Sequence, residues 1–383
     1  MDGVDPSWNR IPHGEAIGQA AREIIAKFDI KEPSASVPAL LKLRSQLNDL
    51  HSKDPIVLAK KEQLDRILQE CLGLKVETTV PASDVVPGEA MKLHTTATIH
   101  AQIHDDIPVR WVAVRYPLLK KEVKRGTDLQ LNKATTFESI EKLPPATPLS
   151  QPYWLRTEGT PGMFHVDDPN LIGTAENRPP FPVEDVFEVG GQTIVIHDEP
   201  VQVVADSQGN QHLLHLKVIP PVSLRFVSDV VVMTPGASRS VQVEIKSARA
   251  GCSGTVQLEA PPDWKVSPAK ESFSLANVGQ SAQFNFSVTA PAKSETARIT
   301  ASAEMHGVRY HNQRQEINYA HIPRQLLQPP AVVKAVSVEL ATRGHTVGYL
   351  PGAGDSLPEN LQEMGYAVKV LDDANLTAKD LEG

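Results

Sequence analysis

Ala282-Gln283-Phe284-Asn285-Phe286-Ser287-Val288 alternates apolar and polar side chains without a break. A period of two is typical of a β-strand with one face in a core and the other in water. Further alternating runs occupy residues 240–245, 254–258, 297–303 and 316–319. Strands at this short and regular spacing predict an immunoglobulin-like β-sandwich over residues 222–322.

A second region of alternating residues precedes this one. Strand patterns occur at 74–79, 109–114, 193–196, 201–204 and 212–218, while 144–182 is rich in Pro, Gly, Asn and Thr. Pro220-Pro221 separates the two regions, because proline cannot donate a hydrogen bond to a sheet ladder. The sequence therefore predicts another β-sandwich, with long loops, over residues 74–221.

Both ends of the chain have a different pattern. Residues 1–73 carry apolar side chains at helical spacing, among them Ile17, Ile24, Ile25 and Phe28, and Gly73 is placed to end the last helix. Residues 333–383 contain a strand, a helix and a second strand, which is one βαβ-like unit. We therefore expect a mainly β protein, with two Ig-like sandwiches preceded by a short helical segment and followed by an incomplete α/β unit.

Composition excludes several classes of function. The net charge of −8 argues against a nucleic-acid partner, which requires a clustered excess of Lys and Arg. No apolar run reaches the roughly 18 residues that a membrane span needs, and residues 1–10 lack the apolar region of a signal peptide. Cys71 and Cys252 are too few for a disulfide framework or a zinc site of their own, so we expect two unpaired thiols.

Three stretches resemble a known family. They are 8–15 (WNRIPHGE), the sandwich 222–321 with 260–266 (APPDWKV) and 317–321 (INYAH), and 348–355 (GYLPGAGD) with 361–370. In this order they resemble the C-terminal half of large bacterial PIG-L (LmbE-like) deacetylases. The sandwich is similar to the NEW3 type that accompanies sugar-binding modules, and the last stretch looks like the opening of a ThuA or glutamine-amidotransferase-like domain.

The resemblance implies an accessory role. Deacetylases of this family hold zinc with a His-Pro-Asp-Asp type of motif, which this chain lacks; its nearest string, 165–169 (HVDDP), has another order. We therefore expect a fragment with no catalytic residue, no metal site and no cofactor of its own, and zinc in a catalytic domain outside this chain. The resemblance further implies contact with that domain, a glycan partner, and a periplasmic or extracellular location.

The loop-rich stretch supplies the candidate glycan-binding residues. Tyr153, Trp154 and Phe164 offer flat aromatic faces for a sugar ring, and His165 and Asp167 offer hydrogen-bonding groups beside them. The alternative is that Trp154 and Phe164 fill a sandwich core, as we expect for Trp111 and Trp264.

Other polar clusters give weaker signals. His212 and His215 are three apart on a predicted strand, so their side chains point to opposite faces and do not readily share a metal ion. His100, His104, Asp105 and Asp106 could ligate zinc or calcium only if a turn gathered them. Gly352-Ala353-Gly354 follows a strand but lacks the rest of a phosphate-binding fingerprint.

The resemblance thus implies a glycan-binding or domain-positioning region of an N-acetylglucosaminyl deacetylase. A free-standing carbohydrate-binding or adhesive sandwich protein is the alternative. A third hypothesis is an enzyme whose site combines His100, Asp105, His165 and Asp167, which metal analysis of the chain would test.

Overall fold

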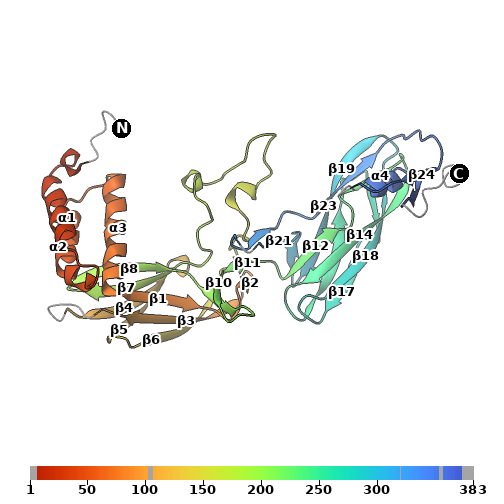
Figure 1. Cartoon of the computed structure of the whole chain (residues 1–383). Helices are drawn as coiled ribbons and strands as arrows, with labels where there is room; N and C mark the ends of the chain where they lie inside the picture. Colours follow the sequence, from red (N-terminus) through yellow and green to blue (C-terminus); the bar gives the residue numbers. More distant parts are fainter. Residues whose placement is uncertain (1–6, 102–106, 320, 353–356, 373–383) are drawn as a thin grey trace. The chain divides into compact units, whose positions relative to one another are not determined.

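The computed structural model describes residues 7–101, 107–319, 321–352 and 357–372. The protein is mainly β, as predicted, and it divides into two compact units (Figure 1). The first contains Met1–Pro148 and Glu176–Val218, and the second contains Leu149–Ala175 and Ile219–Gly383.

The first unit begins with helices and continues with strands. Its helical elements are η1 (Trp8–Arg10), α1 (Glu15–Lys27), η2 (Pro33–Ser36), α2 (Val37–Asp49), α3 (Pro55–Leu72) and η4 (Pro117–Leu119). Its strands are β1 (Leu74–Thr79), β2 (Asp84–Val85), β3 (Ala90–Ile99), β4 (Val109–Tyr116), β5 (Lys121–Asp128), β6 (Thr135–Lys142), β7 (Val183–Val189), β8 (Gln192–Asp198), β9 (Val201–Ala205), β10 (Gln211–His215) and β11 (Lys217–Val218).

Two sheets form the β part of this unit. One has the order β10-β9-β1-β3-β6 and the other the order β5-β4-β7-β8, while β2 and β11 pair separately. Side chains cross between the sheets: the Trp111 ring meets Phe137 edge-on at 6.4 Å, and the hydroxyls of Tyr116 and Ser139 are 2.7 Å apart. Trp111 is fully buried, so the prediction that it belongs to the core is confirmed.

The helices pack within the same unit as these strands. Helix α3 ends where predicted, because Gly73 adopts a left-handed conformation with φ of 57°. The apolar stripe of α1 is only partly covered: Ile17 is buried, whereas Ile25 is 74% and Phe28 48% exposed. The stripe therefore leaves an apolar surface at the end of the helix.

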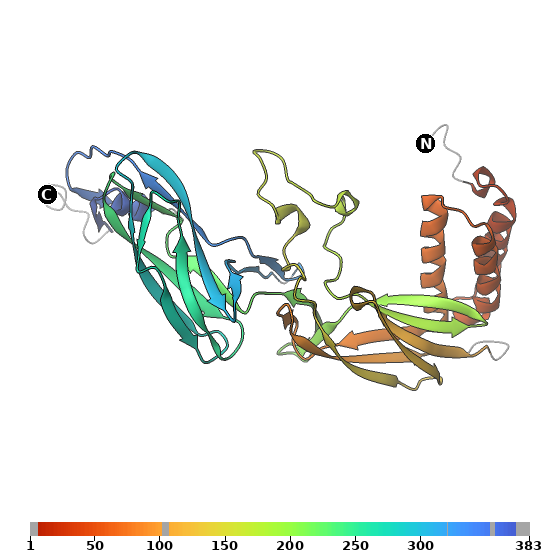
Figure 2. The same ribbon diagram turned by 180° about the vertical axis from the view of Figure 1, so that it is seen from behind.

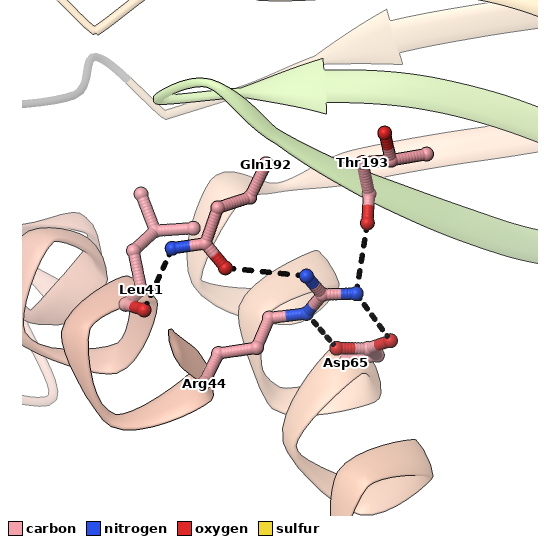
Figure 3. Close-up of polar contacts among 5 residues, drawn as sticks. All are labelled: Leu41, Arg44, Asp65, Gln192 and Thr193. Carbon is pink, nitrogen blue, oxygen red and sulfur yellow. Dashed lines mark hydrogen bonds and ion pairs between the residues drawn. The ribbon is translucent and has the colours of Figure 1, made fainter. Parts of the chain in front are cut away.

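Arg44 joins the helical layer to strand β8 (Figure 3). Its guanidinium donates to both carboxylate oxygens of Asp65 on α3, at 2.6 and 3.2 Å, and to the carbonyl of Thr193 at 2.8 Å. Gln192 accepts from Arg44 at 3.2 Å and donates to the carbonyl of Leu41 at 2.8 Å. One side chain on α2 thus connects two helices and the start of a strand.

The second unit is built from short helices and many strands. Its helical elements are η5 (Tyr153–Leu155), η6 (Pro169–Leu171) and α4 (Leu357–Glu363). Its strands are β12 (Val222–Phe226), β13 (Val230–Met233), β14 (Ser238–Ser247), β15 (Cys252–Glu259), β16 (Lys265–Ser267), β17 (Glu271–Leu275), β18 (Ser281–Thr289), β19 (Glu295–Met305), β20 (Val308–Tyr310), β21 (Gln315–Ile317), β22 (Gln325–Leu327), β23 (Val332–Ser337), β24 (Thr346–Tyr349) and β25 (Ala367–Val370).

Two of its sheets form a sandwich around one apolar core (Figure 2). The smaller sheet has the order β12-β14-β18-β16, and the larger has β13-β23-β19-β15-β17 with β20 paired to β19. Phe286, from the run that predicted this fold, is fully buried, and Trp264 is 4% exposed, as expected for a core residue.

Strand β23 corrects the predicted boundary of the C-terminal segment. We expected the α/β unit to begin at residue 333, but β23 pairs with β19 and runs parallel to β13 inside the sandwich. Its inward side chains Val333 and Ala335 are buried, so the local sequence matches a core strand as well as an α/β strand. The run at 316–319 differs as well, since β21 pairs only with β22 outside the two main sheets.

The predicted βαβ unit follows the sandwich. Strands β24 and β25 are parallel and α4 lies between them in the chain. The long loop 149–175 belongs by its contacts to the second unit, although the sequence had placed it within 74–221. The helices predicted as a separate segment share a unit with the first sandwich.

Candidate binding loop

Hydrogen bonds made by buried polar side chains hold the base of the loop Leu149–Ala175. The backbone N–H of Gln328 donates to the side-chain oxygen of Gln151 at 2.6 Å, and the Gln328 amide donates to the Ser150 carbonyl at 2.7 Å. Tyr153 is 8% exposed and its hydroxyl donates to the carbonyl of Thr174 at 3.3 Å. The start of the loop is therefore attached to Gln328, and the end of the loop is attached to its start through Tyr153.

A tight turn shapes the far part of the loop, drawn in yellow-green in Figure 1. Thr160 and Met163 exchange backbone hydrogen bonds of 3.1 and 3.0 Å, with Pro161 and Gly162 between them. Proline followed by a residue with positive φ is the signature of a type II turn, and Gly162 has φ of 84°. A Cβ at Gly159 would lie 2.4 Å from the Met163 carbonyl, so only glycine fits there.

Large apolar side chains are exposed beyond this turn. Met163 is 71%, Phe164 67% and Ile172 67% exposed. Exposed apolar groups on a loop with a fixed base are typical of a contact surface. The turn residues of the loop thus help to expose these apolar side chains to solvent.

The structure divides the five predicted glycan-binding residues into two roles. Tyr153 is buried and meets the half-buried Trp154 edge-on at 4.8 Å, so it supports the loop and offers no open ring face. Phe164, His165 and Asp167 are exposed, and His165 Nε2 lies 3.1 Å from Asp167 Oδ1. Phe164 does not fill a core, which was the alternative for that residue.

The histidines weighed as metal ligands in the sequence have separate partners. His212 lies 3.0 Å from Asp206, and His215 lies 3.0 Å from Glu199. His100 contacts the Asn132 side chain at 3.0 Å, whereas His104, Asp105 and Asp106 lie outside the described residues. Where the structure describes the chain, no three His, Cys, Asp or Glu side chains are grouped to hold a metal ion.

The remaining sequence candidates are quickly placed. Cys71 and Cys252 are free and buried, and burial raises the pKa of both thiols. Gly352, three residues after β24, is exposed, while Ala353 and Gly354 lie outside the described residues. Among the described helices, none has the length and apolar character to cross a bilayer.

A groove in the helical layer was not predicted. It encloses about 760 Å³, and its walls include Phe28 after α1, Pro33 on η2, and Ile67 and Cys71 on α3. A signal was present in the sequence, because Phe28, at the end of the apolar stripe, is one of the lining residues.

A fully buried carboxyl group, Asp185, and a half-buried one, Asp198, were missed as well. Asp185 on β7 is fully buried between the sheets of the first unit, and burial followed by the nearby Asp198 raises its pKa to about 8. The Trp111 indole lowers this pKa and so offsets part of the rise. Neither Asp185 oxygen has a hydrogen-bond partner among the described residues. The alternation in β7 is the signal, since it points Val183, Asp185, Phe187 and Val189 inward together.

Comparison with known proteins gives no family. No family model matches the sequence, and no curated protein matches it. Among solved structures, Salmonella alpha-2-macroglobulin reacted with methylamine is 10% identical with a TM-score of 0.24, covering 68% of this chain and 16% of its own. The Yersinia pseudotuberculosis adhesin InvE is 10% identical with a TM-score of 0.18, covering 68% of this chain and 60% of its own. A C. elegans MSP family member is 8% identical with a TM-score of 0.19, covering 30% of this chain and 97% of its own.

These similarities are too low to carry an argument about function. The chain spans only a small part of the macroglobulin and less than two thirds of the adhesin. Any function must therefore be argued from the chain's own residues.

Proposed function

We propose that this chain is a binding and positioning region whose loop Leu149–Ala175 contacts a carbohydrate. The observation that carries the proposal is an exposed Phe164 directly followed by the His165–Asp167 pair. A sugar presents a C–H face that packs on an aromatic ring and hydroxyls that exchange hydrogen bonds with imidazole and carboxylate groups. These three neighbouring side chains supply both kinds of contact.

The fixed base of the loop supports this role. Ordering a mobile loop on binding lowers affinity, so a loop already held in shape loses less. The Gln151–Gln328 contact, the Tyr153 hydroxyl and the Pro161-Gly162 turn each restrict the loop before a ligand arrives. This favours a binding surface over a passive connection.

The wider context of the proposal rests on the sequence resemblance alone. In it, the chain is the accessory region of a periplasmic or extracellular PIG-L type deacetylase, zinc belongs to the catalytic domain, and that domain is a further partner. Sequencing the encoding gene tests this part. A His-Pro-Asp-Asp deacetylase region in the same reading frame upstream of Met1 would support it, and an unrelated domain there would remove it.

A glycan array tests the binding proposal directly. We expect the chain to bind N-acetylated glycans and Phe164→Ala to weaken binding about tenfold, which equals ~1.4 kcal/mol. Phe28→Ala is the matched control, because it removes another exposed ring from the helical layer. Equal binding by both variants, or no glycan bound by the wild type, would reject the loop as a carbohydrate site.

The non-catalytic part has its own assay. We expect no hydrolysis of N-acetylglucosamine substrates by the purified chain with zinc added. Activity that a chelator abolishes would contradict this and would support the enzyme hypothesis.

A further inference from the structure

The interior of the first unit contains several buried polar groups. Thr78, Thr95 and Asp185 are each at most 1% exposed, and Asp198 is half-buried beside them. The hydroxyls of Thr78 and Thr95 are 3.0 Å apart across β1 and β3. Buried polar groups are expected to have partners, and leaving one without any destabilises the fold.

Asp185 and Asp198 lie on the same hairpin. Asp185 is opposite Ile196 and Asp198 is opposite Val183, so the two carboxyl groups are diagonal neighbours on the inward face of β7 and β8. One Asp198 oxygen and both Asp185 oxygens have no hydrogen-bond partner among the described residues. Two ionised carboxylates in this position would repel each other without compensation.

Among the described residues, the groups that shift the Asp185 pKa include no cation. On β4 the groups facing this site are the indole of Trp111 and the phenol of Tyr116, whose pKa burial raises to about 12. Thr78 faces Asp198 from β1, and Glu199 follows it in the chain. On β6, Glu141 also acts on Tyr116 and is itself paired with Lys121 of β5 at 2.7 Å. Arg125 of β5 lies over the Trp111 and Phe137 rings, 5.3 and 4.5 Å from their centroids.

We propose that the interior of the first unit is a pH-sensitive switch, in which the Asp185 carboxyl group must be protonated for the two sheets to pack tightly against each other. A protonated Asp185 carboxyl is neutral and removes the repulsion from Asp198, so it fits a site without a cation. The ionised form restores that repulsion, and the sheets loosen around hairpin β7–β8.

The helices respond to the same hairpin. Its turn end carries Gln192 and Thr193, the groups through which Arg44 connects α2 and α3 to β8 (Figure 3). Loosening β8 therefore also weakens the attachment of the helical layer. The protonation state of Asp185 in the core is therefore coupled to the order of the helices outside it.

The direction in which pH changes the stability of the first unit follows from the raised pKa of Asp185. Asp185 has a folded-state pKa of about 8, against about 3.9 in an unfolded chain. Its contribution to stability is complete below about pH 4, declines as pH rises, and is lost above about pH 8. Between these values the unfolding equilibrium constant of the first unit rises about tenfold per pH unit.

The pH-sensitive switch can be tested by hydrogen exchange of the full chain between pH 5 and pH 9, corrected for intrinsic exchange rates. We expect protection of 183–198 and of α2 to fall with rising pH, while β14 in the second unit keeps its protection. Asp185→Asn, a neutral group of the same shape, should abolish the fall. Asp128→Asn is the matched control, since Asp128 is exposed and ends β5 of the same sheet.

Three results would overturn the proposal. One is the same pH dependence in wild type and Asp185→Asn. Another is protection at pH 8 that calcium or magnesium restores in the wild type alone, which would make the pair a cation site. The third is an infrared spectrum of the wild type at pH 6 without a protonated-carboxyl band that disappears by pH 9; this measurement needs no variant.

Discussion

Arg44 concentrates several contacts of the first unit in a single side chain. Its side chain is 14% exposed, and that of its partner Asp65 is 25% exposed. A charged pair shielded to this degree has most of its hydrogen bonds inside the protein, so removing one member leaves the other without compensation. The exposed pair Arg110–Asp128, at 3.8 Å, lacks this protection.

Replacing Arg44 should therefore destabilise the first unit measurably. We expect Arg44→Met to lower its free energy of unfolding by about 2 kcal/mol, because Asp65, Gln192 and the Thr193 carbonyl lose their donor. Arg110→Met should change it by less than about 0.5 kcal/mol. Urea titrations of both variants measure the difference, and equal effects would show that the Arg44 contacts contribute nothing beyond a surface ion pair.

Individual residues differed in how far the sequence predicted them. Trp111 and Trp264 were both assigned to cores, and both are buried. Asp185 was missed because a single carboxyl in an apolar strand has no neighbouring ligand or charge in the sequence to mark it. Tyr153 could not be told from Phe164 by sequence, since burial of a loop aromatic depends on a residue as distant as Thr174.

At the scale of elements, Gly73 links helix α3 to strand β1. Its φ of 57° requires a left-handed backbone, and a Cβ there would lie 3.0 Å from the Cβ of His100 and 3.2 Å from the N of Ala101. Gly209 also has positive φ, of 85°, but a Cβ there would meet nothing within 4 Å. The two positions separate backbone strain from steric conflict.

Alanine at Gly73 should therefore be worse than alanine at Gly209. We expect Gly209→Ala to cost about 1 kcal/mol, from the left-handed conformation alone, and Gly73→Ala to cost about 2 kcal/mol as His100 is displaced. Thermal unfolding of the two variants gives the comparison. A smaller loss for Gly73→Ala would mean that the α3–β1 junction adapts without strain.

Elements were predicted well where their pattern is local. A periodic pattern along one continuous stretch predicted each of these elements: helices α1–α3, strands β14 and β18, and the β24–α4–β25 unit. Strand β23 was not assigned to the sandwich, because its place depends on parallel pairing with β13, about a hundred residues earlier in the chain. A period-two pattern identifies a buried face but does not name the neighbouring strand.

At the scale of the molecule, each unit has an apolar core of its own. Phe187, fully buried on β7, stacks on Trp111 at 6.1 Å in the first core. Phe286, equally buried on β18, belongs to the core of the second. Removing a buried phenylalanine side chain typically costs 3–5 kcal/mol through lost burial and the cavity that remains.

Separate cores should give separate unfolding transitions, and each substitution should affect one of them. We expect Phe187→Ala to lower the midpoint of one calorimetric transition and Phe286→Ala to lower the midpoint of the other. The pH should distinguish the two as well, since raising it from 5 to 9 should lower only the transition that Phe187→Ala affects, because that core contains Asp185. A single transition that both substitutions shift equally would mean that the two units unfold as one cooperative body.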